Sequence, residues 1–315
     1  MFSENKELIG TRVATVISGL KNYSLKDTLE CGQCFRYEKI EECDGWCEYL
    51  VTAKNALIRI GQRRLGELLF FDISDEELHA IAIPHFNLYT DFEEIRTDVL
   101  AHTESEWLRE AAECAKGIAI LSQDPWETLF SFIISQNNNI PRIRKIIKTL
   151  AAEYGENICL QKGIKKCPLS LIDTTPCNEK CKECGICYTF PTAAAVAENP
   201  EKMLSARVGF RYKYLLCAAE RVAGGETNLD MIAAARSYEH TRRELMKIYG
   251  VGEKVAACVA LFGFGNLDAF PIDVWMKRAI DEYFDGSLDH EALGRYRGVA
   301  QQYIFHYIRN LQGKE

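Results

Sequence analysis

Lys254 follows a short glycine turn, Gly250-Val251-Gly252, that separates two stretches with helical spacing of apolar residues. The two glycines let the backbone turn sharply and leave amide groups uncovered at a helix N-terminus, where they can hold a phosphate. Asp273 lies nineteen residues further on, before another helical stretch, where a carboxylate can cap the helix. The local pattern leaves Lys254 open as a solvated charge or an amine nucleophile, beside which Asp273 could stabilise positive charge at a reacting carbon.

The composition is that of a globular protein. The 315 residues are 47% hydrophobic and 26% charged, and the net charge of -7 argues against a general polyanion binder. Backbone amides and helix dipoles can nevertheless bind phosphate without a basic surface. No stretch approaches the roughly 18 apolar residues that cross a membrane, and the start of the chain is unlike a signal peptide. We therefore expect a cytoplasmic protein, nucleoid-associated if the source is prokaryotic, with no membrane partner.

The first 75 residues predict an antiparallel sheet. Alternating and β-branched residues mark its strands, which we expect at residues 34–40, 46–53, 56–62 and 67–73. From about residue 76 the apolar spacing becomes helical and continues to the end of the chain. Asp124 and Pro125 mark one helix start, and a further helix follows Pro141 and ends at Gly155.

These patterns predict an α+β fold, in which an antiparallel sheet layer precedes a mainly helical body. We expect a sheet-containing N-terminal domain at residues 1–118 and a helical domain at residues 119–315. A segment rich in cysteine and lysine, at about residues 159–191, interrupts the helical pattern and reads as an insert.

Several stretches resemble a known enzyme family. LMKIYGVGEKVAAC and AFPIDVWM resemble the helix-hairpin-helix, Gly/Pro loop and aspartate signature of base-excision DNA glycosylases. QDPWETLFSFIISQNNNIPRI, GQCFRY and VGFRYKY are similar to the 8-oxoguanine DNA glycosylase/AP lyase family, and the likeness extends from about residue 25 to 307. The resemblance assigns Lys254 and Asp273 as the catalytic pair, and Gly250, Val251 and Gly252 as the hairpin that holds DNA phosphates.

The resemblance also implies a mechanism. The damaged guanine is flipped out of double-stranded DNA, the lysine amine attacks the sugar C1′, and a Schiff base forms as the base leaves. β-Elimination then nicks the strand, so abasic sites are substrates too. The partner is DNA that contains 8-oxoguanine or an abasic site, the protein is expected to be a monomer, and catalysis requires no cofactor.

The same resemblance assigns two groups of DNA-binding residues. The backbone carbonyl of Gly32 would accept a hydrogen bond from N7 of 8-oxoguanine, and Gln301 would read the Watson-Crick edge of this base. Phe305 would stack on one face of the base, and Cys258 would lie on the other face. Contacts to the cytosine of the opposite strand are assigned to Asn137, Arg142 and Arg211, with Phe210 as a wedge. Taken singly, these residues also fit ordinary turn, core and surface roles. Two departures from the family pattern are Phe210, where a tyrosine is expected, and Trp275, where some relatives carry a histidine.

The insert contains Cys177, Cys181, Cys184 and Cys187, four thiols within eleven residues. This spacing fits a zinc site, or less well an iron-sulfur cluster, and equally a loop with unligated thiols. Thirteen cysteines in all fit reduced thiols or a metal site better than disulfides. For a second group, Cys31, Cys34, Cys43 and Cys47, we expect buried thiols without metal because the residues lie across predicted strands.

Two other functions remain open. One is a related glycosylase that acts on oxidised pyrimidines, adenine or alkylated purines, and the other is a non-catalytic DNA-binding protein. Lys254 disfavours the monofunctional glycosylases, which lack a lysine at this position. The absence of cysteines after Cys258 disfavours the pyrimidine-specific group, whose members carry a four-cysteine cluster after the aspartate.

Overall fold

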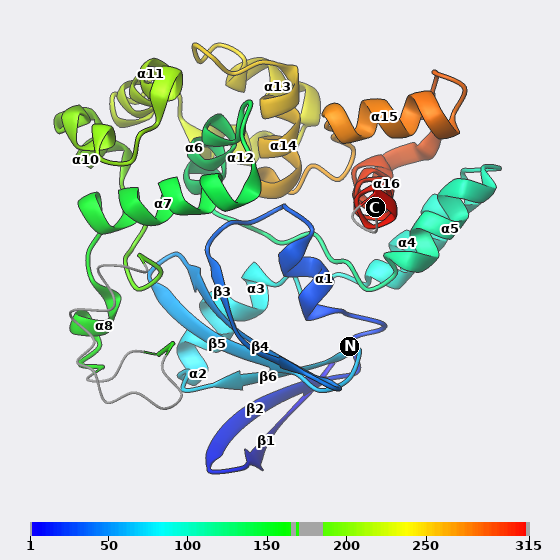
Figure 1. Ribbon diagram of the computed structural model, residues 1–315, viewed down its shortest axis with the longest axis horizontal. Coiled ribbons are helices and arrows are strands. Elements are labelled where there is room, and N and C mark those ends of the chain that lie inside the picture. Colours follow the sequence, from blue (N-terminus) through cyan, green and yellow to red (C-terminus); the bar gives the residue numbers. More distant parts are fainter. Residues whose placement is uncertain (1, 165–167, 170–184, 313–315) are drawn as a thin grey trace.

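The computed structural model describes residues 2–164, 168–169 and 185–312. An antiparallel sheet lies beneath a body of helices (Figure 1). It has six strands in the order β1-β2-β6-β5-β4-β3. The strands are β1 (Ser3–Ile9), β2 (Arg12–Ser18), β3 (Tyr37–Cys43), β4 (Trp46–Ala53), β5 (Ala56–Gln62) and β6 (Glu67–Phe71). The predicted α+β class, with the sheet first and the helices after it, is confirmed.

The sheet differs from the prediction at its edges. Strands β1 and β2 were not expected, and β3 begins at Tyr37 rather than at residue 34. Strand β1 reads SENKELI and is mostly exposed. Its charged residues give no alternating apolar pattern that would predict a strand. The strand forms through backbone pairing with β2, which begins with Ser3 opposite Ser18. A short helix, α1 (Leu25–Glu30), capped by Ser24, also interrupts the predicted sheet region.

The two faces of the sheet pack against different parts of the chain. Tyr49, Ile60 and Phe70 belong to the main hydrophobic core, which continues through the helices. On the other face, Leu50 packs with Ile158, Ile186 and Cys187. Because both faces of the central strands are covered, β4 to β6 are buried along almost their whole length.

The helices occupy most of the remaining chain. They are α2 (Asp75–Glu77), α3 (Ile83–His85), α4 (Phe92–Ala101), α5 (Glu106–Cys114), α6 (Pro125–Ser135), α7 (Ile140–Tyr154), α8 (Ile158–Gln161), α10 (Ala193–Glu198), α11 (Tyr212–Ala223), α12 (Leu229–Ala235), α13 (Tyr238–Leu245), α14 (Glu253–Phe264), α15 (Val274–Tyr283) and α16 (Arg297–Gln312). Shorter turns of π- or 3₁₀-helix are η1 (Leu78–Ala82), η2 (Pro200–Leu204), η3 (Gly209–Arg211) and η4 (Glu291–Tyr296). Within the described ranges, no helix has the length and apolarity needed to cross a membrane.

Local capping explains where the site-forming helices begin. The Asp124 side chain accepts a hydrogen bond from the Glu127 amide at 2.9 Å, which confirms the predicted start of α6. Helix α7 begins at Ile140, one residue before Pro141, because the Asn139 side chain caps it, and it ends at Gly155 as predicted. Helices α4 and α5 lie beside the C-terminal helix α16 (Figure 1). The sheet-containing part therefore contacts the end of the chain.

Candidate active site

The glycine turn is a hairpin between α13 and α14. Gly250 has a φ of +86°, and a Cβ atom built on it would lie 2.2 Å from the Tyr214 ring. A side chain is therefore excluded at Gly250 by conformation and by contact. Gly252 differs, because no atom lies within 4 Å of its Cβ position, so this glycine leaves the backbone open to solvent. The Gln136 side chain donates to the Gly250 carbonyl at 3.1 Å and ties the hairpin to the end of α6.

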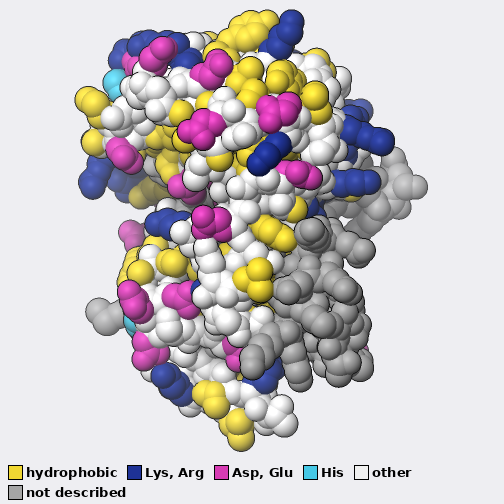
Figure 2. Space-filling view, turned by 90° about the vertical axis from the view of Figure 1, so that its left-hand side faces the viewer, with side chains coloured by type: hydrophobic (Ala, Val, Ile, Leu, Met, Phe, Trp, Pro, Cys, Tyr) yellow, Lys and Arg dark blue, Asp and Glu magenta, His cyan; other side chains and the backbone are white. Residues whose placement is uncertain are grey.

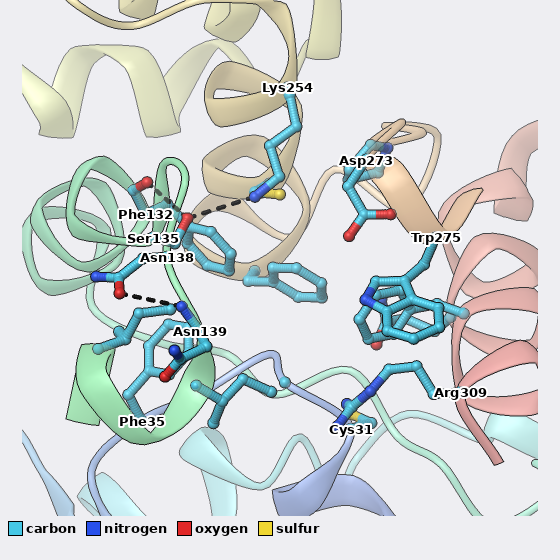
Figure 3. Close-up of a pocket in the computed structure, with 18 of the residues that line it drawn as sticks. Cys31, Phe35, Phe132, Ser135, Asn138, Asn139, Lys254, Asp273, Trp275 and Arg309 are labelled. Carbon is cyan, nitrogen blue, oxygen red and sulfur yellow. Dashed lines mark hydrogen bonds between the residues drawn. The ribbon is translucent and has the colours of Figure 1, made fainter. Parts of the chain in front are cut away.

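Lys254 and Asp273 line the same cavity, which has a volume of about 380 Å³. Lys254 lies in the first turn of α14, and its Nζ atom is 3.4 Å from Oγ of Ser135. The Asp273 carboxylate caps α15 by accepting from the Met276 amide at 2.9 Å. Both side chains point into the cavity from the same side (Figure 3). Among the described residues, neither Lys254 nor Asp273 forms an ion pair within 4.0 Å, so the lysine keeps its amine available.

Aromatic and sulfur-containing side chains form much of the cavity wall. Phe132 is stacked on Phe262 with ring centroids 5.5 Å apart, and Phe35 meets Phe132 edge to face at 5.7 Å. The Lys254 Nζ atom lies 5.2 Å from the Phe132 ring centroid, within cation-π range. Burial raises the pKa of the Cys258 thiol above its ordinary value, while the charge of Lys254 acts in the opposite direction. An apolar wall of this kind suits a flat, aromatic ligand.

The other predicted base-binding residues lie in the same cavity. Gly32, Cys258, Gln301 and Phe305 all line it. Gly32 has a φ of +84°, and a Cβ atom built on it would lie 3.5 Å from Cε1 of Phe305, so a side chain at this position would contact the Phe305 ring. Gln301 is 3% exposed, and its Oε1 atom accepts a hydrogen bond from Gln302 at 2.7 Å. These contacts bring together segments that are far apart in the sequence.

The loop between α6 and α7 carries Asn137, which is exposed and has a left-handed φ of +48°. Arg211 is only 2% exposed. Its guanidinium donates to the Gln136 carbonyl and, at 2.9 Å, to the Asn137 carbonyl. Burial, and then the charge of nearby Arg142, lower the pKa of Arg211. In this structure Arg211 therefore holds the loop, and its expected contact with cytosine stays a prediction.

Phe210 and Arg142 are exposed, as residues that meet the opposite DNA strand must be. The Phe210 ring is 54% exposed and lies 4.5 Å from the Arg211 guanidinium carbon. Phe210 also contacts Tyr214, which in turn contacts the 61% exposed Tyr249 beside the hairpin. An aromatic surface thus extends from the predicted wedge to the predicted phosphate-binding turn.

Charge is mixed on the side of the molecule where α7 and α10 lie. Figure 2 shows basic and acidic side chains interspersed over the helical body and the sheet-bearing part below it. This view agrees with the negative net charge, because a broad basic face is not visible on this side.

The predicted metal site falls largely outside the described residues, because Cys177, Cys181 and Cys184 lie there. Cys187 is described and buried against Leu50, and its carbonyl accepts from the Ile158 amide at 2.8 Å. No group of three or more potential metal ligands occurs within the described ranges.

The second cysteine group agrees with the prediction in part. Cys31, Cys34 and Cys47 are buried thiols, whereas Cys43 is exposed. Cys43 is exposed because it ends the edge strand β3. Burial raises the pKa of Cys31 to about 11, so its thiol is protonated near neutral pH.

Several cavity residues were missed by sequence reasoning. Ser135, Asn138, Gln302 and Arg309 all line the cavity. Ser135 lies within the quoted QDPWETLFSFIISQNNNIPRI stretch, but no spacing rule singles it out. Arg309 lies two helical turns after Gln301, which is the one signal that could have placed it on the same face of α16.

Residues 15–129 match the family described as 8-oxoguanine DNA glycosylase, N-terminal domain. An N-glycosylase/DNA lyase of Saccharomyces cerevisiae is 29% identical over 273 residues. The match covers 81% of this chain and 66% of the yeast protein, so the chain spans slightly less than two thirds of that relative.

Solved structures match almost the whole chain, and two of them serve as examples. The structure of MBOgg1 in complex with a low affinity DNA ligand is 33% identical, with a TM-score of 0.78, and the match covers 98% of this chain and 99% of that one. The Clostridium acetobutylicum 8-oxoguanine glycosylase/lyase, in complex with double-stranded DNA containing cytosine opposite 8-oxoG, is 28% identical. Its TM-score is 0.79, and the match covers 99% of this chain and 98% of that one.

Proposed function

Because the chain belongs to the 8-oxoguanine DNA glycosylase family, we propose that it is a DNA N-glycosylase and AP lyase that removes 8-oxoguanine opposite cytosine. The yeast relative carries the name N-glycosylase/DNA lyase, and the Clostridium relative is described with DNA that has cytosine opposite 8-oxoG. These relatives support the reaction class and the lesion, respectively.

One observation supports the proposal above all others. Lys254 and Asp273 line a single cavity together with Gly32, Cys258 and Phe305, which come from distant parts of the chain. A nucleophile, a carboxylate and an aromatic wall are the groups that base excision by an amine requires. The cavity also lies beside the hairpin, because Lys254 follows Gly252 by two residues. A phosphate held by the hairpin amides would bring the sugar C1′ of a flipped nucleotide towards the lysine.

The proposed reaction begins with an unprotonated Lys254 amine. Its lone pair forms a bond to C1′ while the bond from C1′ to the base nitrogen breaks, and the base leaves with that electron pair and a proton. Asp273 stabilises the positive charge that develops at the sugar. Opening of the sugar ring gives a Schiff base between Nζ and C1′. Loss of a proton from C2′ then expels the 3′ phosphate and cuts the strand.

We extend the proposal to the opposite strand through the exposed residues of the loop and wedge. The side chains of Asn137 and Arg142 can donate to the O2 and N3 acceptors of an unpaired cytosine. Phe210 would fill the space left by the flipped base. Arg211 supports these contacts by holding the backbone of the loop.

Three further parts of the proposal concern the whole protein. We propose that it acts as a monomer and is cytoplasmic. We also keep a metal site at Cys177, Cys181, Cys184 and Cys187 as a proposal. Metal analysis of the purified protein and of a Cys181→Ser/Cys184→Ser variant tests that site: stoichiometric zinc or iron in the parent alone supports it, and its absence from both contradicts it.

An excision assay on a set of lesions and opposite bases tests the proposed specificity. Single-turnover rates are measured for 8-oxoguanine opposite each of the four bases, and for an oxidised pyrimidine, an alkylated purine and adenine opposite 8-oxoguanine. The proposal predicts the fastest excision from the 8-oxoguanine:cytosine duplex. Faster excision of another base would assign a different glycosylase activity, and binding without excision of any base would assign a non-catalytic DNA-binding role.

A further inference from the structure

A second cation, Arg309, lines the cavity opposite the proposed nucleophile. It lies on α16, one helical turn after Phe305, and its guanidinium carbon is 5.4 Å from the Phe305 ring centroid. Lys254 and Asp273 enter the cavity from one side, whereas Arg309 extends from α16 towards Cys31 on the opposite side (Figure 3). The cavity therefore has a charged donor at each end.

Arg309 has no charged or hydrogen-bonded partner among the residues that the structure describes, and its guanidinium lies against the Phe305 ring. Two buried arginines elsewhere, Arg211 and Arg36, have partners within the protein. Arg211 donates to backbone carbonyls, and Arg36 is paired with Glu127 at 3.4 Å. A guanidinium beside an apolar wall loses part of its hydration, so an acceptor that enters the cavity would be bound strongly.

The position of Arg309 indicates which part of a ligand it reaches. A Cβ atom built on Gly32 would lie 3.7 Å from Nη1 of Arg309, so the guanidinium lies beside this glycine. Gln301, Phe305 and Arg309 follow one another at intervals of four residues on one face of α16. The first and last of them are separated by about 12 Å along the helix, which leaves room for a ring system with a hydrogen bond at each end.

We propose that Arg309 is a specificity-determining residue that donates a hydrogen bond to the C8 carbonyl oxygen of the flipped 8-oxoguanine. This inference rests on the proposed function and deepens it. If Gln301 takes the Watson-Crick edge and the base stacks on Phe305, the imidazole end of the purine points along α16 towards Arg309. The C8 carbonyl is the acceptor at that end which guanine lacks. Arg309 then recognises the oxidation itself, next to the N7 hydrogen assigned to Gly32.

Binding in a Lys254→Gln background tests this role without turnover. Fluorescence anisotropy gives Kd values for an 8-oxoguanine:cytosine duplex and for a duplex in which tetrahydrofuran, which has no base, replaces the lesion. Arg309→Leu is expected to raise the Kd for the 8-oxoguanine duplex by roughly 10- to 100-fold, in line with loss of a charged hydrogen bond. The Kd for the tetrahydrofuran duplex should change by less than about twofold, because Arg309 does not act on the sugar or phosphates.

Two variants control the measurement. Arg309→Lys keeps the charge and one donor and should recover part of the lost affinity. Arg295→Leu removes an exposed arginine that also lies near a ring, that of Tyr296 at 4.7 Å, but does not line the cavity, and it should leave both Kd values unchanged.

The outcomes separate this inference from the proposed function. An equal loss on both duplexes would show a backbone contact or a folding defect, and no loss on either would show a solvated charge; each result overturns the role of Arg309. Failure of the proposed function appears instead in the parent, as no excision of 8-oxoguanine. Normal excision by the parent with no effect of Arg309→Leu on lesion binding would reject the inference alone.

Discussion

Two regions of this protein carry buried or half-buried charges, and they differ in whether these charges are paired within the protein. On the sheet, Glu48 is fully buried, yet Arg12 donates to its two carboxylate oxygens at 2.7 and 2.8 Å, and Arg59 donates as well. Burial acts to raise the pKa of Glu48, but the hydrogen bonds from the two arginines outweigh it and hold the pKa below its ordinary value. Every charge in this group has a partner within the protein.

In the cavity, by contrast, Lys254, Asp273 and Arg309 have no ion-pair partner within the described part of the chain. Lys254 lies near the Ser135 hydroxyl, the Phe132 ring and the Cys258 thiol, and Arg309 lies against the Phe305 ring. A paired group such as Glu48 with its arginines stabilises one structure, whereas unpaired donors leave binding free energy for a ligand. The cavity is therefore suited to a molecule that supplies hydrogen-bond acceptors, whereas the charged group on the sheet is suited to stabilising the fold.

The largest effect is expected from Glu48→Ala. Removal of the carboxylate leaves Arg12 and Arg59 facing each other without a counter-charge, which should lower the free energy of unfolding by about 3 to 5 kcal/mol. Urea denaturation measures this change. Glu41→Ala removes an exposed carboxylate at the position paired with Glu48 in the neighbouring strand and should cost less than about 0.5 kcal/mol. Similar costs for the two variants would mean that the paired group does not stabilise the sheet.

Asp273→Asn probes the cavity rather than the fold. Asparagine still caps α15, so the free energy of unfolding and DNA affinity should stay close to those of the parent. Without the negative charge, single-turnover excision of 8-oxoguanine should fall by roughly 10²- to 10³-fold. Asp281→Asn, at an exposed position on the same helix, serves as the control. Loss of folding in Asp273→Asn would show that the residue acts mainly as a cap.

The two hairpin glycines should respond differently to alanine. In Gly250→Ala the added methyl group meets the Tyr214 ring at a backbone conformation that L residues avoid, which should cost about 1 to 3 kcal/mol of stability. Gly252→Ala adds a methyl group in open space and should cost less than about 1 kcal/mol. Thermal unfolding measures both. A greater loss in Gly252→Ala would mean that Tyr214 does not fix the turn.

A smaller, pH-dependent effect is expected from Glu127, a mostly buried carboxylate that pairs with Arg36 at 3.4 Å. Burial raises its pKa to about 7, with Arg36 acting in the opposite direction. The folded protein then holds a proton that the unfolded chain releases, so stability falls as pH rises from about 4.5 to 7. Glu127→Gln removes the titrating carboxyl. Its free energy of unfolding should therefore rise by about 1 to 2 kcal/mol relative to that of the parent as the pH increases from 5 to 8. The free energy of unfolding is measured by denaturation at pH 5, 6.5 and 8. An equal change with pH in the two proteins would contradict the prediction.

Features that depend on nearby residues could be predicted from the sequence. The starts of α6 and α15 follow from the acids at Asp124 and Asp273, because a cap acts on the amides two or three residues later. Strands β4 and β5 follow from their apolar residues. Strand β1 could not be predicted, because its charged sequence becomes a strand only by pairing with β2.

In the site too, features that depend on nearby residues could be predicted, whereas those that depend on distant residues could not. The glycine turn predicts a phosphate-binding hairpin, but the local pattern leaves Lys254 open, and only the combination with distant stretches favours a nucleophile. The burial of Arg211 depends on carbonyl groups more than 70 residues earlier in the chain, and Arg309 enters the cavity through the packing of α16. Such contacts follow from tertiary structure, which local spacing does not specify.

Borohydride trapping tests the central claim, that the Lys254 amine is the nucleophile, most directly. Borohydride reduces a Schiff base between Nζ and C1′ to a stable amine, which denaturing electrophoresis detects as a covalent protein-DNA adduct. With an 8-oxoguanine:cytosine duplex we expect an adduct for the parent and none for Lys254→Gln, although the variant still binds the duplex. No adduct with the parent, or an undiminished adduct with Lys254→Gln, would contradict the account.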